Sequence, residues 1–456
     1  MLNTQTCSWQ PQLATEQRAR ATEIAREIAA RLRERGNIVA AYEAAQQQTA
    51  FPRSVSWQPY TLAQGDAGLA LLCGYLDACF PGKGWDVTGY RYLEIAARAA
   101  EQHSNLPAGL FSGLSGLTFA VEYLSQGGKR YRKLLAACEE TLFPRIIALA
   151  SCLCTQTHDI AVSQFDLISG LSGMGAYLLR RKGVAGARPA LEAILHSLVN
   201  LMAEDTETAL PRWYTPAHLL WDEATRQLYP YGNLNCGLAH GIPGPLGLLS
   251  LAHLASISVD EVEEAIAGNA DWLLRHRMDD QWGVNWPTAV AITADGTVPA
   301  HAPATLAAPF EPSRSAWCYG SPGIARALWF AGEALNRDEY REVAVAAMEA
   351  VYRRPLPVRR IDSPTFCHGI AGLLQITLRF AHDTGLPCFT EAAQTLTEQL
   401  LSLYDPGALL GYYSLEPGNK RVEQPRLLDG VPGVVLVLLA ATSRVEPTWD
   451  RLFLLS

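Results

Sequence analysis

The stretch GLSGLTFAVEYL, residues 113–124, decides the fold of this chain of 456 residues. Two glycines three positions apart open it, and an almost wholly apolar segment follows. The same pattern recurs six more times, at intervals of about 50 to 80 residues, beginning at Gly65, Gly170, Gly241, Gly320, Gly369 and Gly430. Because these segments are apolar nearly all round, each predicts a helix buried on most sides. Glycine permits the positive φ and the close backbone approach that we expect where the chain turns inward.

A second kind of segment alternates with the first. EQRARATEIAREIAARLRER at residues 16–35 and REVAVAAMEAVYRR at residues 341–354 mix charged and apolar residues. Their apolar residues recur at i, i+3, i+4 and i+7, which predicts a helix with one buried face and one face in water. A pair of one inner and one outer helix cannot bury its apolar surface alone, so neighbouring pairs must stack, and a closed ring leaves no unprotected end.

We therefore predict an all-α fold, an α/α toroid (barrel) of about seven inner and seven outer helices. Residues 1–60 are expected to be an N-terminal helical segment that belongs to the outer ring, and residues 61–456 the toroid with its seven repeats. The stretches 211–231 and 282–312 are rich in Pro and Trp, and they leave room for a small β-containing extension.

Composition excludes several classes of function. The formal net charge is −8 and no basic run stands out, whereas nucleic-acid binding requires clustered Lys and Arg. The polar start MLNTQTCSWQPQ has no apolar segment typical of a secretory signal. The longest apolar run near the end, VVLVLLAA, is too short to span a bilayer. We therefore expect no nucleic-acid partner, no membrane span and a cytoplasmic location.

The chemistry-bearing residues fall into two columns when the repeats are aligned on their first glycine. Two residues before that glycine stand Ala63, Phe111, Ile168, Ala239, Cys318, Cys367 and Leu428. One residue before it stand Gln64, Ser112, Ser169, His240, Tyr319, His368 and Asp429. In a ring, the two cysteines of consecutive copies and the histidines of the next column would lie together at one end of the central cavity.

Cys318, Cys367 and His368 carry the ligand types that zinc prefers. Three protein ligands leave a fourth tetrahedral position open, which is typical of a catalytic site. Cys367 and His368 are adjacent, so both can reach one ion only from a turn, where the glycines place them. The same spacing also fits two buried cysteines and a histidine that lines a cavity.

Three further residues are site candidates with open roles. His240 is a fourth metal ligand, a general acid or base, or a cavity histidine bonded to backbone. Asp166 orients a histidine or an arginine, or caps the helix that follows it. Arg314 pairs with Asp166, fixes an anionic intermediate, or lies in a surface loop. Asp66 and Asp429 flank repeat glycines, and we expect them to cap helices.

The motifs AHGIPG at 239–244, WCYGSPG at 317–323 and CHGIAG at 367–372, in this order and on glycine-led helices, resemble the lanthionine synthetase C-like family, the lantibiotic cyclases. The resemblance covers all seven repeats, from about Gly65 onward. It implies two concentric rings of seven helices and one zinc ion held at the positions matching Cys318, Cys367 and His368. The family's active site is lined by the positions matching His240, Asp166, Arg314, Trp317 and Tyr319.

The resemblance also implies an activity. Bacterial members add cysteine thiols to dehydroalanine or dehydrobutyrine in a dehydrated precursor peptide and so form lanthionine or methyllanthionine thioether rings. His240 would then protonate the α-carbon, Asp166 would orient it, and Arg314 would stabilise the enolate, while Trp317 is explained equally well by packing. Because the sequence shows no long dehydratase region, the resemblance implies a separate dehydratase, and a transporter, as partners.

Two other functions fit the same residues. One is a glutathione-binding or thiol-adding lanthionine synthetase C-like protein that acts on other substrates. The other is a non-catalytic α/α-repeat scaffold, since such repeats often only bind partners. The three intact ligand positions argue against the scaffold, which has no need of an open metal position.

Overall fold

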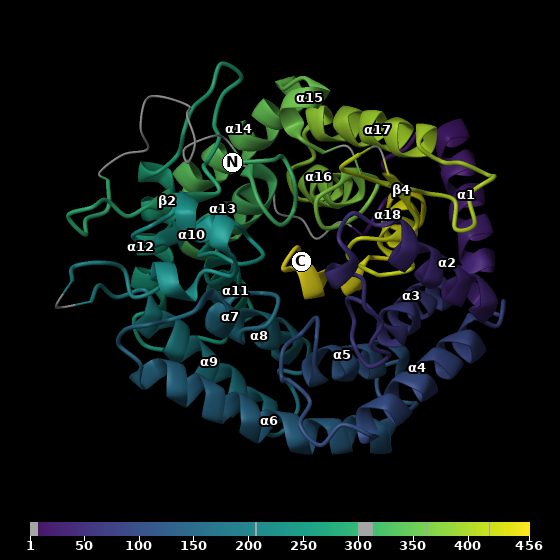
Figure 1. The fold of residues 1–456 in the computed structure, drawn as a ribbon, viewed down its shortest axis with the longest axis horizontal. Coiled ribbons are helices and arrows are strands. Elements are labelled where there is room, and N and C mark those ends of the chain that lie inside the picture. Colours follow the sequence, from purple (N-terminus) through teal and green to yellow (C-terminus); the bar gives the residue numbers. More distant parts are fainter. Residues whose placement is uncertain (1–7, 206–207, 300–312, 362, 419) are drawn as a thin grey trace.

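The fold, seen in a computed structural model that describes residues 8–205, 208–299, 313–361, 363–418 and 420–456, is a toroid of two concentric rings of helices (Figure 1). In this described part, the inner ring holds α3 (Asp66–Cys79), α5 (Leu114–Leu124), α8 (Leu171–Arg180), α11 (Pro243–Leu254), α13 (Ser321–Leu335), α16 (Ile370–Thr384) and α18 (Val431–Thr442). The outer ring holds α1 (Thr15–Arg33), α4 (Trp85–Glu101), α6 (Arg132–Thr155), α9 (Ala187–Leu201), α12 (Val262–Arg275), α14 (Asp338–Arg353) and α17 (Pro387–Ser402). The predicted α/α toroid of seven inner and seven outer helices is confirmed. No helix of the described residues is both long and apolar enough to cross a membrane.

The repeat glycines begin the inner helices, but not mainly for the expected conformational reason. Six of the seven first glycines are the residue directly before an inner helix, and of these only Gly320 has a positive φ, 112°. The requirement is close approach instead. A β-carbon at Gly116, for example, would overlap the backbone carbonyl oxygen of Leu110.

The seven turns that precede the inner helices are joined into a closed circle by backbone hydrogen bonds. Each turn donates one N–H to a carbonyl of the next, at 3.0–3.2 Å. In order, the donor and acceptor pairs are Ala63–Phe111, Phe111–Ile168, Leu167–Ala239, Ala239–Cys318, Cys318–Cys367, Cys367–Leu428 and Leu427–Ala63. This circle fixes which column residues are neighbours, and it closes the ring between the last repeat and the first.

The N-terminal residues complete the ring from outside. Helix α1 packs against α17 and α18, where Gln17 donates to the carbonyl of Gln394 at 2.7 Å and Arg18 donates to that of Thr442 at 2.8 Å. The next helix, α2 (Arg35–Gln48), carries Arg35, which forms an ion pair with the buried Asp66. Asp66 therefore serves as a buried partner of Arg35, and the expectation of a helix cap was wrong because Gly65 occupies the cap position without a side-chain bond. The division of the chain at residue 60 stays a prediction.

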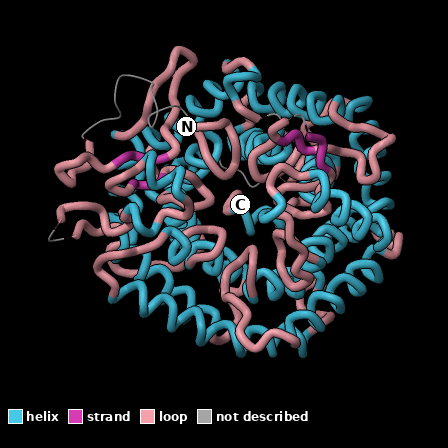
Figure 2. Tube along the Cα trace, viewed as in Figure 1, coloured by secondary structure: helices cyan, strands magenta, loops and turns pink. Residues whose placement is uncertain are grey.

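Two short two-stranded antiparallel sheets belong to neither ring (Figure 2). Strand β1 (Asn233–Asn235) pairs antiparallel with β2 (Ala289–Ala291), with Leu234 opposite Val290. This pairing joins the residues that follow the stretch 211–231 to residues 289–291 of the second stretch, of which residues 300–312 lie outside the described part of the chain. The short helices α7 (Val162–Phe165), η2 (Ala217–Leu219) and α10 (Glu223–Leu228) also belong to neither ring. The β3 (Ser414–Glu416) and β4 (Lys420–Val422) pair lies against α2. The remaining short helices are η1 (Pro52–Ser54) and α15 (Leu356–Arg359).

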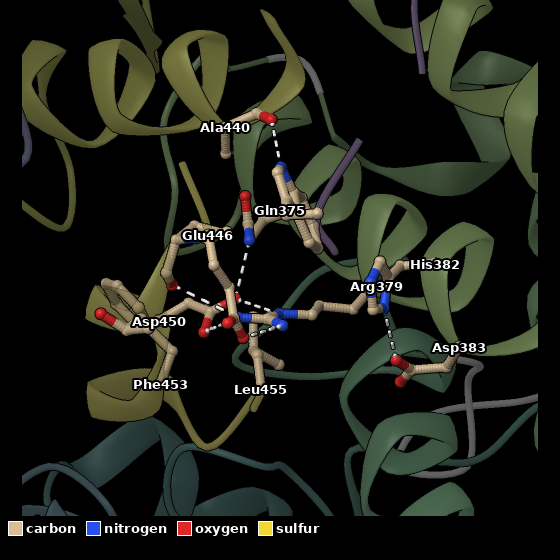
Figure 3. A network of polar contacts seen from close by, with 12 residues as sticks. Gln375, Arg379, His382, Asp383, Ala440, Glu446, Asp450, Phe453 and Leu455 are labelled. Atoms are coloured by element: carbon tan, nitrogen blue, oxygen red, sulfur yellow. Dashed lines mark hydrogen bonds and ion pairs between the residues drawn. The ribbon is translucent and has the colours of Figure 1, made fainter. Parts of the chain in front are cut away.

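The end of the chain fills the centre of the ring (Figure 1). Here η3 (Thr448–Phe453) and the residues after it are held by buried side chains of α13 and α16 (Figure 3). Arg379 donates two hydrogen bonds, of 2.7 and 2.8 Å, to the carboxylate of Asp450, to which Gln375 also donates at 2.7 Å. Arg326 donates to the carbonyl of Leu455 at 2.7 and 3.0 Å. The central space is therefore a packed core at this depth, not an open channel.

Removing the carboxylate at the centre of this network should destabilise the fold strongly. Asp450→Ala removes the buried carboxylate that accepts two hydrogen bonds from Arg379 and leaves only the exposed Glu446, at 3.3 Å, as its ion-pair partner. We expect the loss of this buried partner to lower the free energy of unfolding by about 3–5 kcal/mol. Urea titration followed by circular dichroism measures this. Glu398→Ala is the matched control, because it breaks an exposed pair with Arg20 and should cost less than about 1 kcal/mol. Equal losses in the two variants would contradict the assigned role of the buried pair.

Candidate metal centre

The two predicted cysteine ligands are neighbours in the circle of turns. The N–H of Cys318 donates to the carbonyl of Cys367 at 3.2 Å, and the buried thiol of Cys318 hydrogen-bonds to the partly buried thiol of Cys367. The hydrogen bond from Cys367 lowers the pKa of Cys318 against the opposing effect of burial, and the exposed Arg314 lowers this pKa further. The same hydrogen bond, with burial, raises the pKa of Cys367. Of the two thiols, Cys318 is therefore the one that loses its proton first.

His368 and Asp429 complete a group of potential ligands. One ligand atom each of Cys367, His368 and Asp429 lie within 4.8 Å of one another, and His368 Nδ1 is 3.6 Å from a carboxylate oxygen of Asp429. Cys318 is not one of these three residues, but its thiol interacts with that of Cys367. Two thiols, an imidazole and a nearby carboxylate, brought together from three separate turns, are a donor set that fits zinc.

Asp429 is the member of this cluster that sequence reasoning missed. It was expected to cap a helix, but α18 has Gly430 at its cap and no side-chain cap bond. The carboxylate instead lies near His368 and within 3.8 Å of Arg426. The signal was present, because Asp429 stands in the same column as His240 and His368.

His240 and Asp166 form a second pair. His240 Nδ1 is 2.6 Å from Asp166 Oδ2, although 74 residues separate them. The other oxygen of Asp166 accepts the N–H groups of Ser169 and Gly170 at 2.7 and 2.8 Å. Asp166 therefore both orients the histidine and caps the turn before α8, and no hydrogen bond or ion pair joins it to Arg314, which is also described. His240 Nε2 has no hydrogen-bond partner among the described residues, and 23% of the side chain is exposed.

Two aromatic residues flank Cys318, and they occupy different environments. Trp317 is fully buried; its indole N–H donates to the carbonyl of Phe453 at 3.1 Å and its ring meets that of Phe453 at 5.1 Å. Trp317 thus anchors the Cys318 turn on the C-terminal segment, as the packing interpretation expects. Tyr319 lies 6.2 Å from the ring of His240, and its hydroxyl accepts a 3.1 Å hydrogen bond from Asn235.

Comparison with known proteins places the chain. Residues 56–454 match the family model described as "Lanthionine synthetase C-like protein". A curated relative, "Nisin biosynthesis protein NisC" of Lactococcus lactis subsp. lactis, is 24% identical over 398 residues, which cover 87% of this chain and 88% of the relative. A solved structure titled "Nisin cyclase" is 24% identical in sequence and superposes with a TM-score of 0.74. The match covers 92% of this chain and 98% of that structure's chain. The chain therefore belongs to the lanthionine synthetase C-like family.

Proposed function

We propose that this protein is a zinc-dependent peptide cyclase. It adds cysteine thiols of a precursor peptide to dehydroalanine or dehydrobutyrine residues of the same peptide, and so forms lanthionine or methyllanthionine thioether rings. One observation carries the proposal: the group of Cys367, His368 and Asp429, the adjoining turn that carries Cys318, and the His240–Asp166 pair all stand on neighbouring turns of one circle. The similarity to a protein named for nisin biosynthesis supports the same reaction class.

Cys318, Cys367 and His368 are the residues that would hold the zinc ion. When bound, zinc supplies the chemistry that keeps a cysteine thiol deprotonated and nucleophilic at neutral pH. Asp429 lies near His368, and a carboxylate beside a ligand imidazole raises its basicity and fixes its orientation. The exposed Arg314 adds positive charge next to the two sulfurs.

His240 moves the proton in this proposal. Because Asp166 accepts the Nδ1 proton, Nε2 is the nitrogen that faces the reaction. The sulfur forms a bond to the β-carbon while the carbon–carbon double bond becomes an enolate. The proton that the thiol gave up passes through His240 to the α-carbon, so that sulfur and hydrogen together add across the double bond.

Positive charge near the enolate oxygen stabilises it. The N-termini of the inner helices point their unpaired N–H groups toward the same end of the ring. Arg314 is the cation on this face that we assign to the developing anion. Tyr319, which accepts a hydrogen bond from Asn235, lies near His240, and we assign it to contact with the peptide.

The reaction requires a substrate that has already lost water. We propose that a separate dehydratase converts serine and threonine residues of the precursor peptide first, and that a transporter takes the cyclised product. Both substrate and product then reside in the cytoplasm, which is where we place this protein.

Mass spectrometry tests the proposal directly. A dehydrated precursor peptide is incubated with the zinc-loaded protein and then treated with a thiol-alkylating reagent. We expect the peptide mass to stay unchanged and the alkylatable cysteines to disappear faster than in a control without protein. Cysteines that remain alkylatable at the control rate would contradict the proposal. Consumption of added glutathione in place of peptide cysteine would favour a thiol-adding protein that acts on other substrates.

A further inference from the structure

Described residues of the two Pro- and Trp-rich stretches, 211–231 and 282–299, line a pocket beside the proposed catalytic histidine, together with residues of neighbouring turns. Its volume is about 390 Å³. The walls come from α7, from the segment between α9 and α11, from β1 and β2, and from the turn that carries Cys318. The lining residues are Val162, Thr215, Leu219, Leu220, Trp221, Thr225, Leu228, Tyr229, Asn233, Asn235, Thr288, Ala289, Tyr319 and Arg360.

The pocket is continuous with the site already described. Trp221 packs its ring against His240, with centroids 4.7 Å apart and planes at 75°. Tyr319, the residue after Cys318, lines the pocket and lies 6.2 Å from the His240 ring. One residue of an extended peptide spans about 3.3–3.6 Å. A peptide residue one or two positions from the reacting carbon therefore reaches this pocket.

The surface of the pocket is mainly apolar, and part of it is exposed. Trp221 is 54% exposed and Leu228 43% exposed, beside the buried Leu220 and Tyr229. Apolar and aromatic side chains gathered around a concave surface, with polar groups between them, are typical of ligand sites. The polar and charged residues of this lining are Thr215, Thr225, Asn233, Asn235, Thr288 and Arg360. The volume lies at the low end of the range for such sites, which suits one or two side chains.

We propose that this pocket binds an aliphatic or aromatic side chain of the substrate peptide, next to the dehydroamino acid that reacts at His240. The inference rests on the proposed function, because it assigns a subsite to that reaction. The pocket thereby selects which dehydroamino acids are presented to the thiol. Trp221, in the wall of the pocket, also packs against the His240 ring and restricts its orientation.

Binding of unreactive peptides tests the pocket independently of catalysis. Two sets of cysteine-containing peptides carry alanine in place of dehydroalanine. In the first set the residue before this alanine is Leu, Phe, Gly or Asp, and in the second set the residue after it is varied in the same way. Isothermal titration with the zinc-loaded protein should give about 10- to 100-fold tighter binding for Leu or Phe than for Gly in one set. Equal affinities in both sets, or a preference for Asp, would overturn the proposal.

Two variants and a matched control locate the effect. Leu228→Asp places a charge on the wall, and Thr225→Phe fills the pocket; each should reduce the Leu-to-Gly preference to less than about threefold. Leu415→Asp is the control, because Leu415 is 52% exposed on the distant β3 and its substitution should keep the preference. An unchanged preference in both pocket variants also contradicts the assignment.

The same peptides with dehydroalanine restored separate the two proposals. Cyclisation at equal rates whatever the flanking residue would contradict the pocket and leave the proposed reaction standing. Selective binding without any cyclisation would contradict the reaction and leave the pocket standing.

Discussion

Cys318→Ala should abolish zinc binding and peptide cyclisation together. The thiol of Cys318 is one of two sulfurs that share a hydrogen bond in the cluster, and its loss leaves Cys367 and His368 as the only two proposed ligands. Even residues that act only on a zinc ligand typically change metal affinity by 10–100-fold, so the loss of a ligand should exceed that range. Zinc content is measured by elemental analysis after dialysis, and affinity by competition with a chromophoric chelator.

The control for this prediction is another buried cysteine. Cys138, on α6, is 8% exposed, compared with 7% for Cys318, and lies outside the cluster. Cys138→Ala should keep one zinc per chain and its activity, which separates the loss of a ligand from the loss of a packed thiol. Circular dichroism checks that both variants fold. A Cys318→Ala protein that retains stoichiometric zinc and full activity would falsify the metal assignment.

His240→Ala should keep zinc but slow ring closure by about 10²- to 10⁴-fold, the usual contribution of a general acid or base. His240 contacts Asp166, and the ligand cluster lies on other turns, so metal affinity should not change. Asp166→Asn should also slow the reaction, because the amide cannot hold the Nδ1–H tautomer as the carboxylate does. Single-turnover rates on a dehydrated peptide, with zinc content measured on the same samples, give both quantities.

His253 provides the matched control for His240. It lies near the end of α11, its side chain is also 23% exposed, and it also faces a carboxylate, Glu263 at 3.7 Å. His253→Ala should leave the rate of ring closure within about twofold. Loss of zinc from His240→Ala would instead make His240 a metal ligand, and equal rates for the two variants would remove it from the mechanism.

Much of the fold could be predicted because its signals are local. An outer helix such as α14 has apolar residues on one side, whereas an inner helix such as α18 is apolar all round. This difference can be seen within the sequence of each helix alone. The glycines mark where each inner helix begins. Of the two reasons expected for these glycines, only close backbone approach holds for most of them, and positive φ does not.

The site could be predicted in part, for a different reason. Residues at the same position of consecutive repeats lie next to each other in the ring. Cys318 and Cys367 could therefore be placed side by side, although 49 residues separate them in the sequence. His368 followed from its adjacency to Cys367. Asp429 occupies the same register in the next repeat, so its place near His368 could have been predicted in the same way. It was missed because an aspartate beside a repeat glycine was interpreted as a helix cap.

The sequence by itself determined the alternation of helices, the number of repeats and the column in which the chemistry lies, because each depends on residues a few positions apart. Only the tertiary structure decided that Asp166 orients His240, that the C-terminal segment fills the ring and anchors Trp317, and that Trp221 closes a pocket on His240. These contacts join segments without a periodic pattern across long loops. Their geometry depends on the circle of turns, which brings together segments far apart in the chain and which the hydrogen bond from Leu427 to Ala63 closes.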